Sequence, residues 1–305
     1  MALCPPLFRS YQLTTITISH GIDSLNCTLG SLLEAAAMGL GATRTGAFAA
    51  LVPTLPMFFS TWETYHTHTL FLGAFNGPTE GLIIACSLMI LSGIFGPEIF
   101  HTPLSSFITI DHPLARFTGA DLLPAILLLT FFNTHLPGCI DNVIKARRAA
   151  NLPLKPVFLQ WTPMVVYSAA TCLWLGSPHS IVLPENYLVL WCLTHSSVFG
   201  RLTTKIILAH LTRQPFPYWT VLLTPLVGGS VLFGLVPMLL GGPIVDAQWE
   251  RVYLWSYFVF AVVVYARWAV LVVGAITSYL GINCLTIPAE KQRENEEARR
   301  KAKSG

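Results

Sequence analysis

The sequence has 305 residues, of which 53% are hydrophobic and only 11% are charged, and its mean hydropathy is +0.60. Soluble domains carry about 25% charged residues, so this composition excludes an ordinary soluble domain and predicts an integral membrane protein. The formal net charge of +3 is too small to indicate nucleic-acid binding. None of the seven cysteines forms a CxxC pair, which favours small buried residues over a disulfide or zinc framework.

Eight apolar segments predict an all-α polytopic transmembrane helix bundle, because a spanning helix needs about 20 mostly apolar residues. The predicted spans are residues 25–42, 46–62, 81–100, 119–137, 157–176, 185–209, 217–240 and 250–284. The first two are rich in Gly and Ala, so we expect them in the interior of the bundle. Pairs of Pro and Gly mark several span ends, at Pro137-Gly138, Gly77-Pro78 and Gly242-Pro243.

Basic residues gather in three segments that fall on one side of an eight-span bundle. These residues are Lys145, Arg147, Arg148 and Lys155; Arg213; and Lys291, Arg293, Arg299, Arg300, Lys301 and Lys303. The opposite loops hold only Arg44, Arg116 and Arg251. Because cytosolic loops carry the excess of Lys and Arg, this side is predicted to be cytosolic. Asp23 and residues 61–81 then lie at the same cytosolic face and can converge on one site.

The first candidate site is at the start of the first span. His20 and Asp23 are one helical turn apart, and Glu34 follows about three turns later. A carboxylate within a span usually has a partner or a function. The alternative is that Asp23 or Ser24 caps the first helix while Glu34 pairs within the bundle.

The second candidate site comprises Glu63, His66, His68, Asn76 and Glu80. A Glu-x-x-His pair with a further His is one arrangement that holds a divalent ion. The same groups at a membrane mouth suit an amine head group or a nucleotide. The alternative is an amphipathic interfacial segment whose aromatic residues lie at the level of the lipid headgroups.

Two polar groups fall within the sixth span. His195, Ser196 and Ser197 lack the GxSxG context of a nucleophile, so we interpret them as a hydrogen-bonded cluster inside the bundle. Arg201 and Lys205 are one turn apart, and this spacing suits either a phosphate group or two side chains that reach the membrane interface.

Three segments resemble the eukaryotic choline/ethanolamine phosphotransferases of the CDP-alcohol phosphotransferase family. They are "HGIDSLNCTLGSLLEAAAMGLG", "TWETYHTHTLFLGAFNGPTEG" and "YLGINCLTIP". The resemblance covers about residues 20–288. It therefore divides the chain into a non-matching N-terminal segment at 1–19, a transmembrane domain at 20–288 and a charged cytosolic tail at 289–305.

The resemblance implies a reaction and its participants. Phosphocholine or phosphoethanolamine passes from CDP-choline or CDP-ethanolamine to diacylglycerol, and CMP leaves. In the family signature D-G-x2-A-R-x8-G-x3-D-x3-D, the aspartates hold Mg²⁺ or Mn²⁺ on the diphosphate. By this resemblance Asp23 is a metal ligand, and His20 or Asp23 is the catalytic base. The resemblance also implies an endoplasmic reticulum or Golgi membrane and a homodimer.

This sequence departs from the signature immediately before His20. Ser19 stands where the signature has Asp, Thr15 stands where it has Gly, and no D-G-x2-A-R precedes them. The family also has about ten spans, against the eight predicted here. We therefore expect a chain that is N-terminally incomplete relative to the family and impaired in activity. The alternatives are a non-catalytic membrane protein that dimerises with full-length relatives and a polytopic transporter, against which the lack of an inverted repeat counts.

Overall fold

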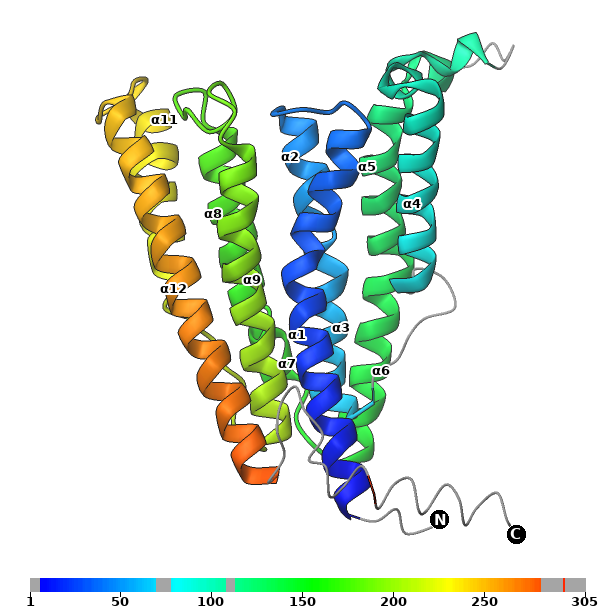
Figure 1. Ribbon diagram of the computed structural model, residues 1–305, viewed down its shortest axis with the longest axis vertical. Helices are drawn as coiled ribbons and strands as arrows, with labels where there is room; N and C mark the ends of the chain where they lie inside the picture. The colour runs from blue at the N-terminus through cyan, green and yellow to red at the C-terminus, as the bar shows by residue number, and fades with distance from the viewer. Residues whose placement is uncertain (1–5, 70–77, 108–112, 281–292, 294–305) are drawn as a thin grey trace.

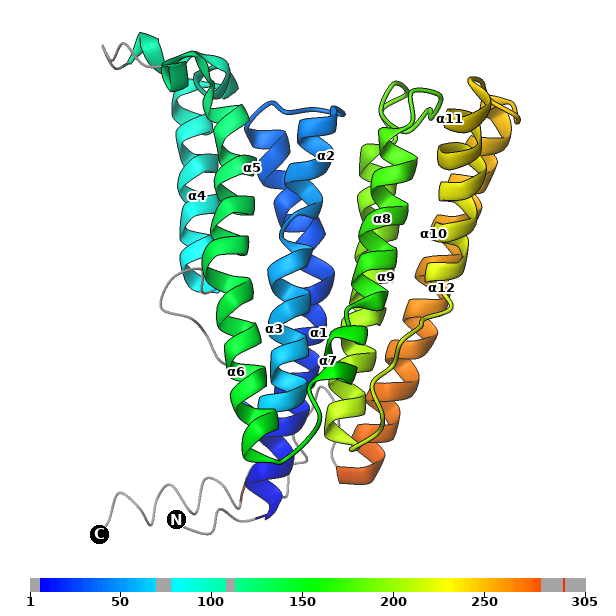
Figure 2. The same ribbon diagram turned by 180° about the vertical axis from the view of Figure 1, so that it is seen from behind.

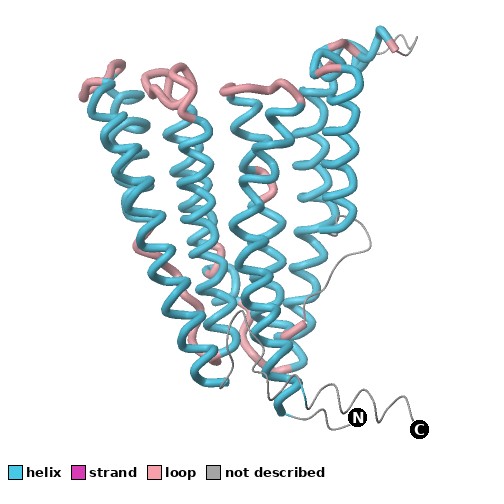
Figure 3. Tube along the Cα trace, in the orientation of Figure 1, coloured by secondary structure: helices cyan, strands magenta, loops and turns pink. Residues whose placement is uncertain are grey.

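The computed structural model describes residues 6–69, 78–107, 113–280 and 293. Within these residues the regular elements are helices, and no strand occurs among them (Figure 3). The predicted all-α class is therefore confirmed.

Long helices alternate with short turns along the chain. The α-helices are α1 (Pro6–Ala37), α2 (Arg44–Leu51), α3 (Thr54–Thr67), α4 (Pro78–Phe95), α5 (Gly119–Thr130), α6 (Leu136–Ala149), α7 (Lys155–Leu159), α8 (Thr162–Gly176), α9 (Leu188–Leu211), α10 (Leu223–Gly229), α11 (Val236–Leu240) and α12 (Ala247–Leu280). Three short 3₁₀ helices follow α4: η1 (Pro97–His101), η2 (Leu104–Ser106) and η3 (Pro113–Arg116). Two π-helical turns, η4 (Phe131–His135) and η5 (Ser230–Leu235), interrupt otherwise continuous helices.

Each predicted span falls mainly on one helix or on a run of successive helices. Three stretches of the described residues are long and apolar enough to cross a membrane: Gly119–Ala149, Leu223–Leu240 and Ala247–Tyr279. Gly81–Phe95 is apolar but shorter. The fold is thus a membrane helix bundle, whereas the count of eight spans stays a prediction.

The first two predicted spans lie in the interior, as expected from their small residues. Helix α1 packs mainly against α9, and α2 packs against α1. Ala47 and Ala50 of α2 are 2% and 0% exposed. The small side chains therefore allow the close helix contacts that hold the centre of the bundle.

The predicted bounds of these two spans were wrong. Helix α1 begins at Pro6 rather than near residue 25, and it ends at Ala37 because Gly39 and Gly41 adopt left-handed conformations, with φ of 70° and 57°. The second predicted span is split into α2 and α3 at Pro53, which has no N–H to continue the helical hydrogen bonds.

Pro137-Gly138 does not end the fourth span. Helical structure continues from Gly119 to Ala149, because the π-turn at 131–135 widens the helix just before the proline. Leu136 N donates to Phe131 O across this wider turn, and such turns accommodate a disturbed helical hydrogen-bond ladder. The other two pairs do mark element ends, since α4 starts at Pro78 and α11 ends at Leu240.

Helices α6, α9 and α12 end, and α1 begins, at the same end of the bundle (Figure 1, lower end). We call this the basic end, because Lys145, Arg147, Arg148, Lys155 and Arg213 lie in or beside the turns there. Helix α3 also runs toward it (Figure 2). The predicted grouping of these basic residues is therefore present in the fold, whereas the assignment of this end to the cytosol stays a prediction.

Candidate functional site

One face of α1 is built for contact with α9. Gly21, Ser24 and Thr28 are buried at helical spacing. A Cβ atom on Gly21 would lie 3.0 Å from Thr204 Cγ2 of α9. One turn further along, Ser196 Oγ donates to Leu25 O at 2.6 Å. These contacts fix the depth and rotation of α1 against α9, and they determine where the neighbouring motif residues lie.

The other face of α1 presents Ser19 and Asp23, which are exposed and one turn apart. Within the described residues, the side chain of Asp23 forms no hydrogen bond or ion pair. The side chain of His20 lies outside the described part of the structure. Asp23 is therefore an open carboxylate whose oxygens are available to a ligand.

The capping alternative for Asp23 and Ser24 is wrong. Helix α1 starts at Pro6, so both residues lie deep inside it and their side chains are not needed by an N-terminus. The predicted pairing of Glu34 is not found either, since the side chain of this partly buried residue forms no hydrogen bond or ion pair within the described residues.

Glu63, near the end of α3, points into the protein. Its side chain is 3% exposed, and Asn142 Nδ2 of α6 donates to Glu63 Oε1 at 2.7 Å. A buried carboxylate is tolerated only when hydrogen bonds replace its hydration. Glu63 thus joins α3 to α6, and its assignment to substrate binding stays a prediction.

The side chain of His66 also points into the protein, toward Gln160 at the end of α7. Its Nε2 lies 2.6 Å from Gln160 Oε1, which also accepts a hydrogen bond from Trp62 Nε1 at 3.0 Å. His66 follows the predicted span 46–62, and burial lowers its pKa to about 4, an effect that the Gln160 hydrogen bond partly offsets. His66 is therefore a neutral hydrogen-bond donor at neutral pH.

His68 ends α3 and contacts a different helix. Its Nδ1 lies 3.2 Å from His210 Nδ1 of α9, and the two rings stack with centroids 4.8 Å apart. Beside them, Tyr65 Oη donates to Gln214 O at 2.9 Å. The second motif thus connects α3 to α6, to Gln160 at the end of α7 and to α9 through three separate side chains.

The predicted convergence of these residues on one site stays a prediction. Within the described residues, no hydrogen bond or ion pair joins Asp23 to Glu63, His66 or His68. Asn76 lies outside the described residues, and so does the side chain of Glu80 in α4.

A divalent metal does not fit the side chains that the structure describes. Among them, no group of three or more His, Cys, Asp or Glu residues lies close enough to hold a metal ion. The ion-site alternative for Glu63, His66 and His68 is therefore not supported, because these side chains contact three different partners. On α1, Asp23 and the partly buried Glu34 have no described side-chain partner, but they lie about three turns apart, and Mg²⁺ or Mn²⁺ sites need more oxygen ligands than one side chain supplies.

The polar cluster in α9 is confirmed as an internal hydrogen-bonded group. His195 is 0% exposed, and its two ring nitrogens contact Trp191 O at 3.0 Å and Thr171 Oγ1 at 3.2 Å. Ser196 bonds to α1 as described above. These residues hold α8, α9 and α1 together.

Sequence reasoning missed Gln160, Asn142 and Glu250, which organise the buried polar contacts. Each is a polar residue in or beside an apolar segment, and that signal was available. Their partners are Trp62, Glu63 and Trp174, respectively, and these lie 76 to 98 positions away in the chain. Nothing local in the sequence indicates such pairs.

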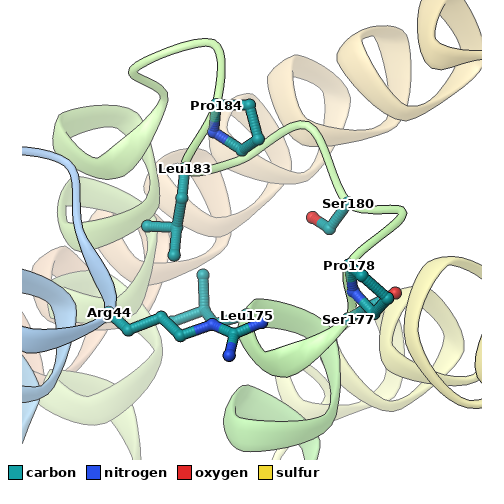
Figure 4. A pocket seen from close by; sticks show the side chains of 7 residues that line it. All are labelled: Arg44, Leu175, Ser177, Pro178, Ser180, Leu183 and Pro184. Atoms are coloured by element: carbon teal, nitrogen blue, oxygen red, sulfur yellow. The ribbon is translucent and has the colours of Figure 1, made fainter.

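A cavity of about 200 Å³ lies at the other end of the bundle. Figure 4 shows the Arg44 side chain extending beneath the loop that carries Ser177, Ser180 and Pro184. Arg44 Nη2 donates to Gly176 O at 3.2 Å. Neither candidate site lines this cavity.

The chain is similar to CDP-alcohol phosphatidyltransferase family proteins and to choline/ethanolaminephosphotransferases. It is 30% identical over 287 residues to an uncharacterized CDP-alcohol phosphatidyltransferase class-I family protein of Schizosaccharomyces pombe, covering 90% of this chain and 69% of that protein. It is 29% identical over 277 residues to choline/ethanolaminephosphotransferase 2 of Arabidopsis thaliana, covering 88% of this chain and 69% of that protein.

A further relative is choline/ethanolaminephosphotransferase 1 of Saccharomyces cerevisiae. The identity is 30% over 226 residues, which is 68% of this chain and 54% of that protein. No family model matches the chain. The extent and identity of the match to the S. pombe protein nevertheless confirm the resemblance found in the sequence. The chain belongs to the CDP-alcohol phosphatidyltransferase class-I family.

Proposed function

We propose that this protein is a phosphotransferase of phospholipid biosynthesis whose 305-residue chain is impaired in catalysis. Its substrates are CDP-choline or CDP-ethanolamine and diacylglycerol. The observation that carries the proposal is the similarity to choline/ethanolaminephosphotransferases over 68% to 88% of the chain. The open carboxylate of Asp23 supports the proposal, because it lies in a segment that resembles the family.

The chemistry is a substitution at phosphorus. The diacylglycerol hydroxyl oxygen attacks the phosphorus that bears the alcohol, the bond from that phosphorus to the CMP oxygen breaks, and CMP leaves. We assign His20 or Asp23 to accept the hydroxyl proton, because a positioned base contributes typically 10²–10⁴-fold to a rate. Glu63, His66, His68, Asn76 and Glu80 stay candidates for substrate binding.

The impairment follows from the residues on α1. The family signature places a carboxylate one turn before Asp23, where this chain has Ser19. In the family such carboxylates hold Mg²⁺ or Mn²⁺, which supply several kcal/mol of charge stabilisation at the diphosphate. Each 1.4 kcal/mol is about tenfold in rate, so we expect transfer slower than in a relative with the full signature by orders of magnitude.

The test is a transfer assay with the purified 305-residue chain in detergent micelles that contain diacylglycerol. CDP-choline and CDP-ethanolamine are supplied separately with Mg²⁺, and choline/ethanolaminephosphotransferase 1 of S. cerevisiae serves as the reference. We expect slow transfer that Asp23→Asn abolishes and Asp141→Asn, on the exposed face of α6, leaves unchanged. A rate equal to that of the reference would contradict the impairment. Residual transfer indifferent to Asp23→Asn would contradict the site.

We further propose an endoplasmic reticulum or Golgi location with the basic end and the tail in the cytosol. The cluster of Lys and Arg at the basic end supports this orientation. In sealed microsomes, a protease added outside is expected to remove an epitope placed after residue 305. Protection of that epitope would reverse the orientation.

A non-catalytic role is the second candidate, and Ser19 favours it because the family has Asp there. In this role the chain forms dimers with full-length relatives. Co-expression with a tagged full-length relative tests it, since co-purification together with altered transferase activity supports the role. Absence of both effects would remove it.

A further inference from the structure

Residues 212–222 join α9 to α10 without a helix and run back into the bundle. Figure 2 shows this segment climbing beside α12 from the end of α9. At its far end, Thr220 contacts Arg201, which lies about 15 Å before the end of α9. The predicted span 217–240 therefore begins with extended chain, and its helix starts only at Leu223.

Non-helical chain at membrane depth is tolerated where protein covers it or where it borders a water-filled cavity. Here two cationic side chains of α9 hold it. Arg201 Nη1 donates to Thr220 Oγ1 at 2.7 Å, and Lys205 Nζ donates to Trp219 O at 2.8 Å. Thr220 is 1% exposed, whereas Trp219 is 45% exposed. The segment therefore has a buried side against Arg201 and an open side.

Neither cation is neutralised by a carboxylate that the structure describes. Within the described residues, no carboxylate forms an ion pair with Arg201 or Lys205. The Nε of Arg201 is buried without a hydrogen-bond partner there, and its guanidinium lies 5.3 Å from the ring centroid of Trp268. Two positive charges one turn apart at this depth are costly unless an anion compensates them.

The cation pair lies at the same layer of the bundle as the motif on α1. Thr204, between Arg201 and Lys205 in the chain, is the residue that abuts Gly21. Thr204 Oγ1 also lies 3.4 Å from Trp268 Nε1 of α12. A ligand held by Arg201 and Lys205 would thus lie between α9, α12 and the 212–222 segment, near the layer of Gly21.

We propose that Arg201 and Lys205 form a binding site for a phosphate group. Arginine and lysine donate charge-assisted hydrogen bonds to phosphate oxygens, and both side chains keep donors that no described residue accepts. The phosphate belongs to a lipid headgroup or to a nucleotide. The site does not depend on transfer activity, so it stands or falls separately from the proposed function.

The test uses the full 305-residue chain in phosphatidylcholine nanodiscs. Inorganic phosphate, CDP-choline and phosphatidic acid are titrated separately, and binding is followed by phosphorus NMR. We expect at least one probe to bind. Arg201→Gln and Lys205→Gln should each raise the Kd for that probe by about tenfold. Loss of phosphatidic acid binding in these two variants identifies a lipid headgroup as the source of the phosphate. Loss of CDP-choline binding identifies a nucleotide as the source.

Three controls separate binding from folding. Arg148→Gln, an exposed cation at the basic end, is expected to leave binding unchanged. Thr220→Val removes the hydrogen bond of Arg201 but keeps both charges, and Lys205→Arg keeps the charge, so both should retain most of the affinity. The proposal is overturned if no probe binds or if every folded variant, including Arg148→Gln, binds alike.

Discussion

Glu250 and Asp23 are carboxylates on the two longest helices, and the fold treats them in opposite ways. Glu250 is 3% exposed, and it accepts hydrogen bonds from Trp174 Nε1 at 2.8 Å, Ser180 Oγ at 2.7 Å and Ile181 N at 3.2 Å. Asp23 is exposed, and its carboxylate has no hydrogen bond among the described residues. A carboxylate whose oxygens are already used holds helices together, whereas an open one is available for chemistry.

Glu250→Ala should produce the largest loss of stability. It leaves Trp174 Nε1, Ser180 Oγ and Ile181 N buried without an acceptor, and removing the partner of such groups costs about 3–5 kcal/mol. Thermal unfolding followed by size-exclusion chromatography measures the effect. The matched control is Glu185→Ala, because Glu185 forms an exposed ion pair with Arg251 at 2.9 Å, worth about 0–1 kcal/mol. Equal losses in both variants would contradict the structural role of Glu250.

Gly229→Ala should produce the second-largest loss of stability. A Cβ there would lie 1.9 Å from Trp174 Cζ3, so the ring that binds Glu250 must move, at about 1–3 kcal/mol. Gly274→Ala in α12 meets nothing within 4 Å and should be neutral or slightly stabilising. Comparing the two unfolding curves checks this contrast, and an unchanged Gly229→Ala protein would show that the Trp174 packing is looser than described.

Glu63→Gln tests whether Glu63 holds helices together, as Glu250 does, or is available to a ligand, as Asp23 is. The substitution keeps an acceptor for Asn142 but removes the charge, so we expect a loss of about 1 kcal/mol. If Glu63 only joins α3 to α6, transfer activity should fall only as far as the fraction of folded protein falls. If activity falls tenfold or more in a fully folded Glu63→Gln protein, Glu63 acts on the substrate.

Asp23→Asn should have the smallest effect on stability. An exposed side chain without a described partner contributes within about 0.5 kcal/mol. The same unfolding assay measures it beside Glu250→Ala. A loss comparable to that of Glu250→Ala would mean that Asp23 is structural and would remove the contrast between the two carboxylates.

The sequence predicted the helices better than their ends or their contacts. Apolar runs identify the bundle, but the Thr-rich residues before His20 have low helix propensity, so no local pattern indicated that α1 starts at Pro6. The motif residues were predicted, whereas the inward direction of Glu63 and His66 depends on Asn142 and Gln160, more than 75 positions away. Rotation of a helix about its axis is a tertiary property, and no local pattern specifies it.

Asp23 is an open ligand without the neighbouring carboxylate that the family signature has at the position of Ser19. A Mn²⁺ titration followed by electron paramagnetic resonance tests it with the 305-residue chain and its Ser19→Asp variant. Ser19 and Asp23 share one exposed face of α1, and a second carboxylate raises the affinity of an oxygen site. We predict that Ser19→Asp binds Mn²⁺ at least about tenfold more tightly and that adding Asp23→Asn reverses the gain. Equal Mn²⁺ affinity in the unaltered chain and in Ser19→Asp would contradict the claim.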